Sequence, residues 1–479
     1  MSLKQKTISG VVWSFAEAFF LKGLSFVTML LLARWLGPID FGLMGMIAVF
    51  IGIGTSLVDS GMTASIIRTK NADDSDFTTV FYMNMAMSLL VYAIMFFAAP
   101  HIASFFGQTI LIEVIRIYCL TFIISAFSAI QLAILNKEML FKKLALLNVP
   151  SIIIGVGVGL FLGYNDYGVW SIVSMYMTTQ AILSILLWKT GSWKPGLNFS
   201  KEKLKFHYNF GYKLMLAGLM DVIFKNSYNI IIGKFFPVQT LGYFERARRF
   251  SQYPSQTITD IVGKVTYPML AQLQDDTPKL AMIYRNLLRI AFFIIAPLML
   301  GMAAIAEPLF DSVLGSEWIP AVPYFQILSL AGMLFPIHAF NVNVFKVYGR
   351  SDLFLKIDII KRSILVLALI IGFQFGVLGL VWGSVFVSLV SLLINTYYAS
   401  KLIDYSTKRQ LLDMLPILVV AGLTFLLMYH SVGIFTDYGN LVQLMVASLI
   451  GITFYLSIHS FFKASPLYAL ITIIKNRRL

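Results

Sequence analysis

The sequence predicts an all-α polytopic membrane protein with about fourteen transmembrane helices, and three observations support this class. Hydrophobic residues make up 58% of the 479-residue chain, charged residues only 13%, and the mean hydropathy is +0.81. The apolar residues gather in stretches of about 20, the length that a helix needs to cross the hydrocarbon core. Almost all basic residues outside these stretches fall in every second connection. A water-soluble globular fold is therefore excluded.

Each apolar stretch is predicted to form one spanning helix, because a helix satisfies its backbone hydrogen bonds within a single segment. The first stretch contains Glu17 and Lys22 and lacks a small-x-small cleavage site, so we expect a span and not a removable signal. In chain order the stretches cover residues 10–32, 41–58, 79–98, 113–135, 145–164, 168–188, 209–232, 241–270, 287–305, 321–345, 354–374, 377–398, 412–430 and 440–462.

The basic residues predict the orientation of the chain. One set of connections contains nearly all the Lys and Arg residues that lie outside the apolar stretches, whereas the other set holds only Arg34 and Lys234 and includes an acidic loop at 306–320. Because short loops rich in Lys and Arg stay in the cytoplasm, the first set is cytoplasmic. An even number of spans then places both termini in the cytoplasm.

Two ten-residue segments, 33–42 and 233–242, indicate an internal duplication. Their small, basic, aromatic and apolar positions correspond at an offset of two hundred residues, and both end in glycine, Gly42 and Gly242. Each follows the first span of a six-span block, as expected for parallel repeats. The predicted organisation is an N-terminal six-helix lobe (1–188), a cytoplasmic linker (189–208), a C-terminal six-helix lobe (209–400), and two additional helices with a basic tail (401–479).

Several functions are disfavoured by what the chain contains. The net charge of +14 is scattered over short cytoplasmic segments, so we expect no nucleic-acid binding. Cys119 is the only cysteine, and the histidines show no ligand spacing, so neither a metal site nor a cofactor is expected. The largest outer loop, 306–320, is too short for a catalytic domain. We therefore expect that the chain is not an enzyme.

Short motifs in both halves carry a resemblance to a known family. They are ARWLGP (33–38), FG (41–42), DSG (59–61), ASIIR (64–68), IIGK (231–234), LGYF (241–244), RA (246–247) and VTYP (265–268). With these motifs the chain resembles the polysaccharide transporters, the lipid-linked oligosaccharide flippases of the multidrug/oligosaccharidyl-lipid/polysaccharide exporter superfamily. The pattern is most similar to the colanic-acid and teichuronic-acid exporter branch, over about residues 5–400. The resemblance implies a cationic central cavity, alternating access of two lobes, and a bacterial inner-membrane location.

The eighth predicted span carries the densest polar stripe. Its residues follow steps of four, three, four and four and so share one helix face: Glu245, Arg249, Gln252, Gln256 and Asp260. Arg248 borders the stripe on one side, and Arg246 and Lys264 border it on the other. Charges inside a span normally face protein or water. The alternative is an interfacial helix whose charges extend to the membrane surface.

The seventh and first spans add further polar residues. Asp221, Lys225 and Asn229 lie on one face of the seventh span, where Asp221 and Lys225 could simply pair with each other. In the first span, Ser25 shares a face with Glu17, whereas Lys22 lies about 140° from Glu17 at 100° per residue. Lys22 and Glu17 therefore cannot form a simple pair within the helix.

The expected function is export of a polyprenyl-pyrophosphate-linked oligosaccharide from the cytoplasmic to the outer leaflet by alternating access, for exopolysaccharide, capsule or O-antigen synthesis. The expected pyrophosphate contacts are Lys22, Lys225, Arg246, Arg249, Arg248 and Lys264. The expected glycan contacts are Ser25, Asn229, Gln252 and Gln256. Glu17, Asp221 and Asp260 are candidates for ion coupling.

Besides this substrate, membrane lipids and the polysaccharide polymerase and chain-length machinery are the expected partners. Three alternatives stay open. A multidrug antiporter of the same superfamily would need an acidic cavity for cationic substrates, whereas these spans are net basic. A lipid II flippase would share the fold and the substrate chemistry. A membrane glycan polymerase, from a different functional class, is disfavoured by the short outer loops.

Overall fold

The computed structural model describes residues 20, 23–464 and 466–468, and within them all side chains except those of residues 261, 262, 264, 265 and 268. The described residues form helices and turns and contain no strand. Ten helical segments among them are long and apolar enough to cross a membrane, and a shorter apolar helix covers Gly23–Trp35. The predicted all-α membrane class is therefore confirmed.

Helices also lie at the predicted spans 209–232, 241–270 and 354–374, but they are not among these ten segments. The reason is their content of polar residues, such as Asp358, Lys361 and Arg362 within the last of them. The number of fourteen spans stays a prediction.

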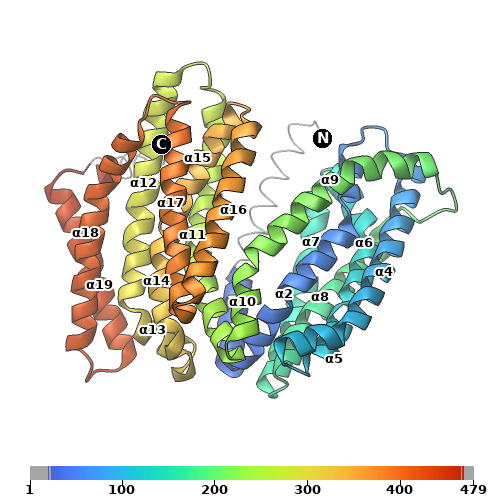
Figure 1. The fold of residues 1–479 in the computed structure, drawn as a ribbon, viewed down its shortest axis with the longest axis horizontal. Coiled ribbons are helices and arrows are strands. Elements are labelled where there is room, and N and C mark those ends of the chain that lie inside the picture. The colour runs from blue at the N-terminus through green and yellow to red at the C-terminus, as the bar shows by residue number, and fades with distance from the viewer. Residues whose placement is uncertain (1–19, 21–22, 465, 469–479) are drawn as a thin grey trace. The chain divides into compact units, whose positions relative to one another are not determined.

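The chain forms two compact units that divide after Gly242 (Figure 1). The first unit contains α2 (Pro38–Asp59), α3 (Met62–Arg68), α4 (Asp74–Phe106), α5 (Leu111–Tyr118), α6 (Leu120–Lys137), α7 (Phe141–Tyr164), α8 (Val169–Thr190), α9 (Lys201–Lys225) and α10 (Ser227–Phe235). Helices α7 and α8 pack along each other, as do α4 and α6. By compactness α9 and α10 belong with the N-terminal helices, because α9 packs on α2, α3 and α4. The lobe boundary expected at 189–208 concerns the duplication and stays a prediction.

The second unit begins within α11 (Val238–Ala271), whose first residues still belong to the first unit. It continues with α12 (Thr277–Ala304), α13 (Ala306–Val313), the 3-10 helix η1 (Ser316–Ala321), α14 (Val322–Gly332), α15 (Phe335–Val347), α16 (Ser351–Phe373), α17 (Gly376–Ser400), α18 (Thr407–Ile434) and α19 (Asn440–Phe461). Its core forms around α12, where Tyr284, Phe292 and Met299 are buried. Helix α18 packs on both α12 and α19.

The two segments of the predicted duplication adopt the same conformation within the first unit. A helix ends, two non-helical residues follow, and a new helix starts at Pro38 in one segment and at Val238 in the other. The N–H of Leu36 donates to the carbonyl of Leu32 (2.7 Å), and the N–H of Phe236 donates to the carbonyl of Ile232 (3.0 Å). These hydrogen bonds occupy corresponding positions two hundred residues apart.

The glycines that end the two segments make reciprocal contacts. A Cβ atom on Gly42 would lie 2.1 Å from the carbonyl oxygen of Val238, and a Cβ atom on Gly242 would lie 1.9 Å from that of Pro38. No side chain fits at such distances, so glycine is required where the start of each helix meets the other. The shared glycine of the motif is thus explained by packing.

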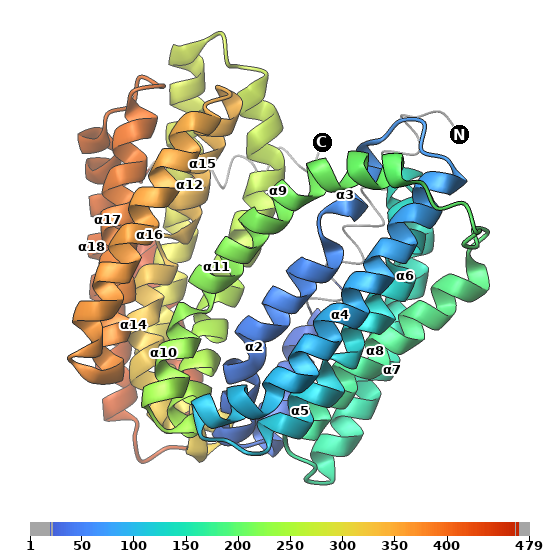
Figure 2. The ribbon, with the colours of Figure 1, turned by 45° about the vertical axis from the view of Figure 1, so that its right-hand side comes forward.

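Helix α9 runs across the ends of α3 and α4 and then alongside α2 (Figure 2). Its approach to α2 depends on a second pair of glycines. Ser60 and Gly61 adopt positive φ values of 48° and 66° where α2 ends. Gly61 then lies against Gly211 of α9, where an added Cβ would be 2.5 Å from the Gly211 carbonyl oxygen.

Candidate functional site

The exposed face of α11 is polar between Arg249 and Asp260. Arg249, Gln256 and Asp260 are exposed on one face, and Gln252 beside them is half-buried. On α19 one stripe of exposed residues follows a similar spacing but is apolar: Leu441, Met445, Leu449, Ile452 and Leu456. An apolar face suits contact with lipid tails, whereas ionisable groups in a membrane normally face water or protein. The exposed face of α11 is therefore suited to a water-filled path.

The opposite face of α11 fixes the helix in the second unit. Phe244, Ala247 and Phe250 are buried there, and Phe250 packs against Phe310 with ring centroids 5.3 Å apart. The hydroxyl of Ser251 donates to the carbonyl of Leu328 at 3.0 Å. The apolar side of the helix thus orients the polar side.

Glu245 organises the charged start of the stripe. One of its carboxylate oxygens lies 3.3 Å from Arg248, and the other lies 3.6 Å from Arg249. The Arg249 side chain remains 62% exposed, compared with 24% for Arg248. Arg249 is therefore the arginine of this cluster that a ligand can reach most easily.

Arg246 lies elsewhere, although it neighbours the same stripe in the sequence. It is among the largest fully buried side chains, and its guanidinium carbon lies 5.3 Å from the ring centroid of Trp318. A guanidinium over an indole face is a favourable cation–π contact. Its position suits holding α11 against η1 better than meeting a ligand.

The candidates of the first unit are arranged differently. Lys225 and Asp221 form an ion pair of 2.7 Å, with side-chain exposures of 69% and 45%. Asn229 is buried and donates to the carbonyl of Gly45 on α2 at 3.2 Å, whereas Ser25 is exposed. The pairing considered from the sequence for Asp221 and Lys225 is thus present, and Asn229 joins α10 to α2. Glu17, Lys22 and the side chain of Lys264 lie outside the described residues.

A buried polar network, which sequence reasoning did not find, joins α9 to α3 and α4. His207 is fully buried; its Nε2 donates to Asp76 Oδ1 at 3.0 Å, and its Nδ1 lies 2.8 Å from Ser65 Oγ. Lys203 donates to Asp76 and also pairs with Asp73. The hydrogen bond from Lys203, followed by that from the N–H of Asp76, lowers the pKa of Asp73 from 3.8 to about 2.

These residues lie far apart in the sequence, so their spacing gave no signal. The one local signal is the capping box at the start of α4, in which the side chains of Asp73 and Asp76 each accept a hydrogen bond from the backbone N–H of the other. Burial of both Ser65 and His207 leaves no room for a substrate, so we interpret the network as structural.

The fold and the polar helix face together define a class of protein. The structure is similar to that of the lipid II flippase MurJ in an inward closed conformation, with a TM-score of 0.75 and 17% identity, covering 94% of this chain and 98% of that one. An inward-facing multidrug resistance MATE transporter of the MOP superfamily matches with a TM-score of 0.59 and 18% identity, covering 80% and 95%. The chain therefore has the fold of the MOP transporter superfamily.

Within that class, the chain belongs to the polysaccharide biosynthesis protein family, which it matches over residues 31–323. It is 24% identical to the lipopolysaccharide biosynthesis protein WzxC of Escherichia coli K12, covering 91% of this chain and 89% of that protein. It is 23% identical to the teichuronic acid biosynthesis protein TuaB of Bacillus subtilis, covering 77% of each. The succinoglycan biosynthesis transport protein ExoT of Rhizobium meliloti is 24% identical, covering 71% and 69%. The predicted family is thus confirmed.

Proposed function

We propose that this protein is a flippase that moves polyprenyl-pyrophosphate-linked oligosaccharide repeat units from the cytoplasmic to the outer leaflet of a bacterial inner membrane, by alternating access. The relatives named for lipopolysaccharide, teichuronic acid and succinoglycan biosynthesis support a role in supplying a polysaccharide pathway. A pyrophosphate bearing several sugars cannot cross hydrocarbon unaided, since burying unpaired charge is very costly. The protein must therefore supply a polar path.

The exposed polar face of α11 is the observation that carries this proposal. Arg249 offers a cation that is accessible to an anionic headgroup, while Gln252 and Gln256 offer amides that can bond sugar hydroxyls. In the first unit Lys225 is another exposed cation. We assign the pyrophosphate contact first to Arg249 and the glycan contacts to the two glutamines. The burial of Arg246 against Trp318 favours a positioning role for it.

The membrane potential can supply the energy for export. Moving one charge through 100 mV is worth about 2.3 kcal/mol, so a doubly negative headgroup leaving an inside-negative cell gains roughly twice that. Asp221, Asp260 and Glu17 remain candidates for proton or sodium coupling. The polymerase and chain-length machinery that would use the exported repeat unit are the partners that this function implies.

The proposed orientation has both termini in the cytoplasm. In a Cys119→Ala background, single cysteines at Ser200 and Ser406 should resist an impermeant thiol reagent in intact cells, because the topology places both in the cytoplasm. Cysteines at Gln108 and Ser316 should react. Labelling of Ser200 in intact cells would overturn the orientation.

Export by way of Arg249 is tested by the Arg249→Ala variant in a strain lacking the chromosomal copy. The expected result is loss of surface polysaccharide, accumulation of completed lipid-linked repeat units on the cytoplasmic leaflet, and unchanged protein abundance. The matched control is Arg350→Ala, since Arg350 is also exposed and paired with a carboxylate, Asp352, at 2.7 Å. Normal export by the Arg249 variant would show that the polar face of α11 does not line the substrate path. A deletion strain without accumulated repeat units would contradict the flippase function itself.

A further inference from the structure

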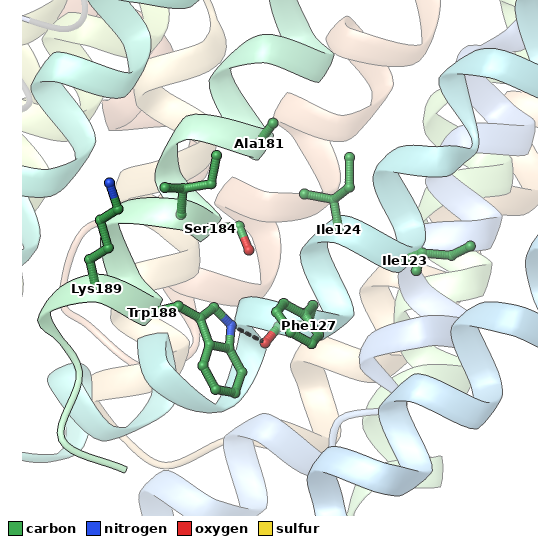
Figure 3. Close-up of a pocket in the computed structure, with 8 residues that line it drawn as sticks. Ile123, Ile124, Phe127, Ala181, Ser184, Trp188 and Lys189 are labelled. Atoms are coloured by element: carbon green, nitrogen blue, oxygen red, sulfur yellow. Dashed lines mark hydrogen bonds between the residues drawn. The ribbon is translucent and has the colours of Figure 1, made fainter. Parts of the chain in front are cut away.

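The first unit carries a groove whose lining includes none of the polar residues of α11. It has a volume of about 550 Å³ and runs between α6 and α8 (Figure 3). We call it the α6–α8 groove, and its lining residues are Ile123, Ile124, Phe127, Ala181, Ser184, Ile185, Trp188 and Lys189. Apart from Ser184 and Lys189 the lining is apolar, so the groove suits a hydrocarbon chain.

Two contacts join the walls of the groove at one end. The indole of Trp188 stacks on Phe127 with ring centroids 4.6 Å apart, and its Nε1 donates to the backbone carbonyl of Phe127 at 3.0 Å (Figure 3). These contacts join α8 to α6 across the groove. Because they are made within the protein itself, the groove is formed before a lipid binds, which lowers the cost of ordering its walls.

The groove has a polar end and an apolar end. Trp188 and Lys189 lie in the last turn of α8, where tryptophan and lysine commonly mark the level of lipid headgroups. Ala181 lies seven residues earlier, which corresponds to about 10 Å along the helix at 1.5 Å per residue. The groove therefore extends from the headgroup level into the hydrocarbon region.

The polar end is positively charged. Lys189 is exposed, and Lys143 from α7 reaches the same helix end, where its Nζ donates to the carbonyl of Thr190 at 2.8 Å. In the predicted topology both lysines face the cytoplasm. Basic residues at this level attract anionic lipid headgroups. An apolar channel that ends in cations is complementary to an anionic lipid.

We propose that the α6–α8 groove binds one acyl chain of an anionic phospholipid of the cytoplasmic leaflet, with its phosphate against Lys189. The occupant is a bilayer phospholipid and not a polyprenyl carrier, because the groove is short. Such a lipid, bound between α6 and α8, would stabilise the first unit independently of the exported substrate.

The test places brominated acyl chains next to Trp188 and measures tryptophan quenching. The full-length protein is reconstituted in phosphatidylcholine vesicles that contain a minor fraction of brominated phosphatidylglycerol. A second set contains the same fraction of brominated phosphatidylcholine instead. The contribution of Trp188 is the difference between the wild type and Trp188→Phe. We expect brominated phosphatidylglycerol to be enriched about fivefold at Trp188, as fits one basic residue at an anionic surface.

Two substitutions separate a headgroup site from ordinary lipid contact. Lys189→Ala should abolish the preference for phosphatidylglycerol, whereas Lys194→Ala, at an exposed lysine outside the groove, should leave it unchanged. Equal quenching by the two brominated lipids would overturn the proposal, as would a preference that survives Lys189→Ala. Relief of the quenching by polyprenyl phosphate, but not by unlabelled phosphatidylglycerol, would also overturn it.

Discussion

The segments 33–42 and 233–242 have the same backbone conformation but lead into different helices. In each segment the start of the new helix packs against the glycine of the other segment, Gly42 or Gly242. The backbone hydrogen bonds of the two segments are equivalent. The helix that follows the first copy, α2, has 22 residues, whereas α11 has 34. The part that the two copies share is therefore a packing contact between the helix starts. The copies differ in the helices that follow the two glycines.

The residues after the two glycines show this difference in chemistry. Gly45, Met46 and Val49 are buried on α2, at the positions that correspond to Glu245, Arg246 and Arg249 on α11. The first copy thus packs within its unit where the second carries charge. We infer that the charged residues of α11, which have no counterpart on α2, take part in transport.

The two helices also end differently. Helix α2 stops at the left-handed Ser60 and Gly61, and the chain is then held to α9 through the buried Ser65–His207–Asp76 network. Helix α11 continues past the corresponding positions as far as Ala271. The first copy is anchored, whereas the second remains a long helix with an exposed polar face.

Replacing the shared glycines should have the largest effect. Gly42→Leu and Gly242→Leu should each lower membrane abundance severely and to a similar degree, because each new side chain would collide with a backbone carbonyl. Immunoblots of membrane fractions measure this. Gly422→Leu is the control, since nothing lies within 4 Å of an added Cβ there. A severe defect at only one of the two glycines would break the equivalence.

Asp76→Ala should have the next largest effect, by releasing the anchored end of the first copy. It removes the carboxylate that accepts from Lys203 and His207, and loss of one partner of a buried pair costs about 3–5 kcal/mol. Thermal unfolding in detergent should shift to lower temperature. Asp74→Ala in the same helical turn is the control, since Asp74 is exposed. Equal unfolding temperatures for the two variants would show that the network does not anchor α9.

Arg249→Lys should have a smaller effect, confined to transport. Lysine keeps the charge but loses the planar fork that binds two oxygens at once, so export should be reduced without being abolished. The initial rate of surface polysaccharide appearance is the measurement. Arg246→Lys should instead lower protein abundance, because the buried guanidinium packs on Trp318. If both variants lowered only the export rate, the distinction between a positioning and a substrate-contacting arginine would be lost.

Sequence periodicity was sufficient to predict some features of α11 and of the duplication. The steps of four and three from Glu245 to Asp260 predict a shared helix face, and the structure exposes Arg249, Gln256 and Asp260 on one side. The correspondence of 33–42 with 233–242 was likewise visible. Local spacing suffices in both cases, because helix geometry fixes which side a residue occupies.

The sequence by itself determined the membrane class, because apolar length and charge placement are local properties of the chain. It also indicated the family and the polar face of α11. Only the tertiary structure decided which charged residues are buried. Arg246 and Arg249 are three residues apart and chemically alike, yet one packs on Trp318 and the other is exposed. The network at His207 likewise joins residues more than a hundred positions apart. Burial and partnership depend on which helices meet, and that is settled by packing over the whole unit.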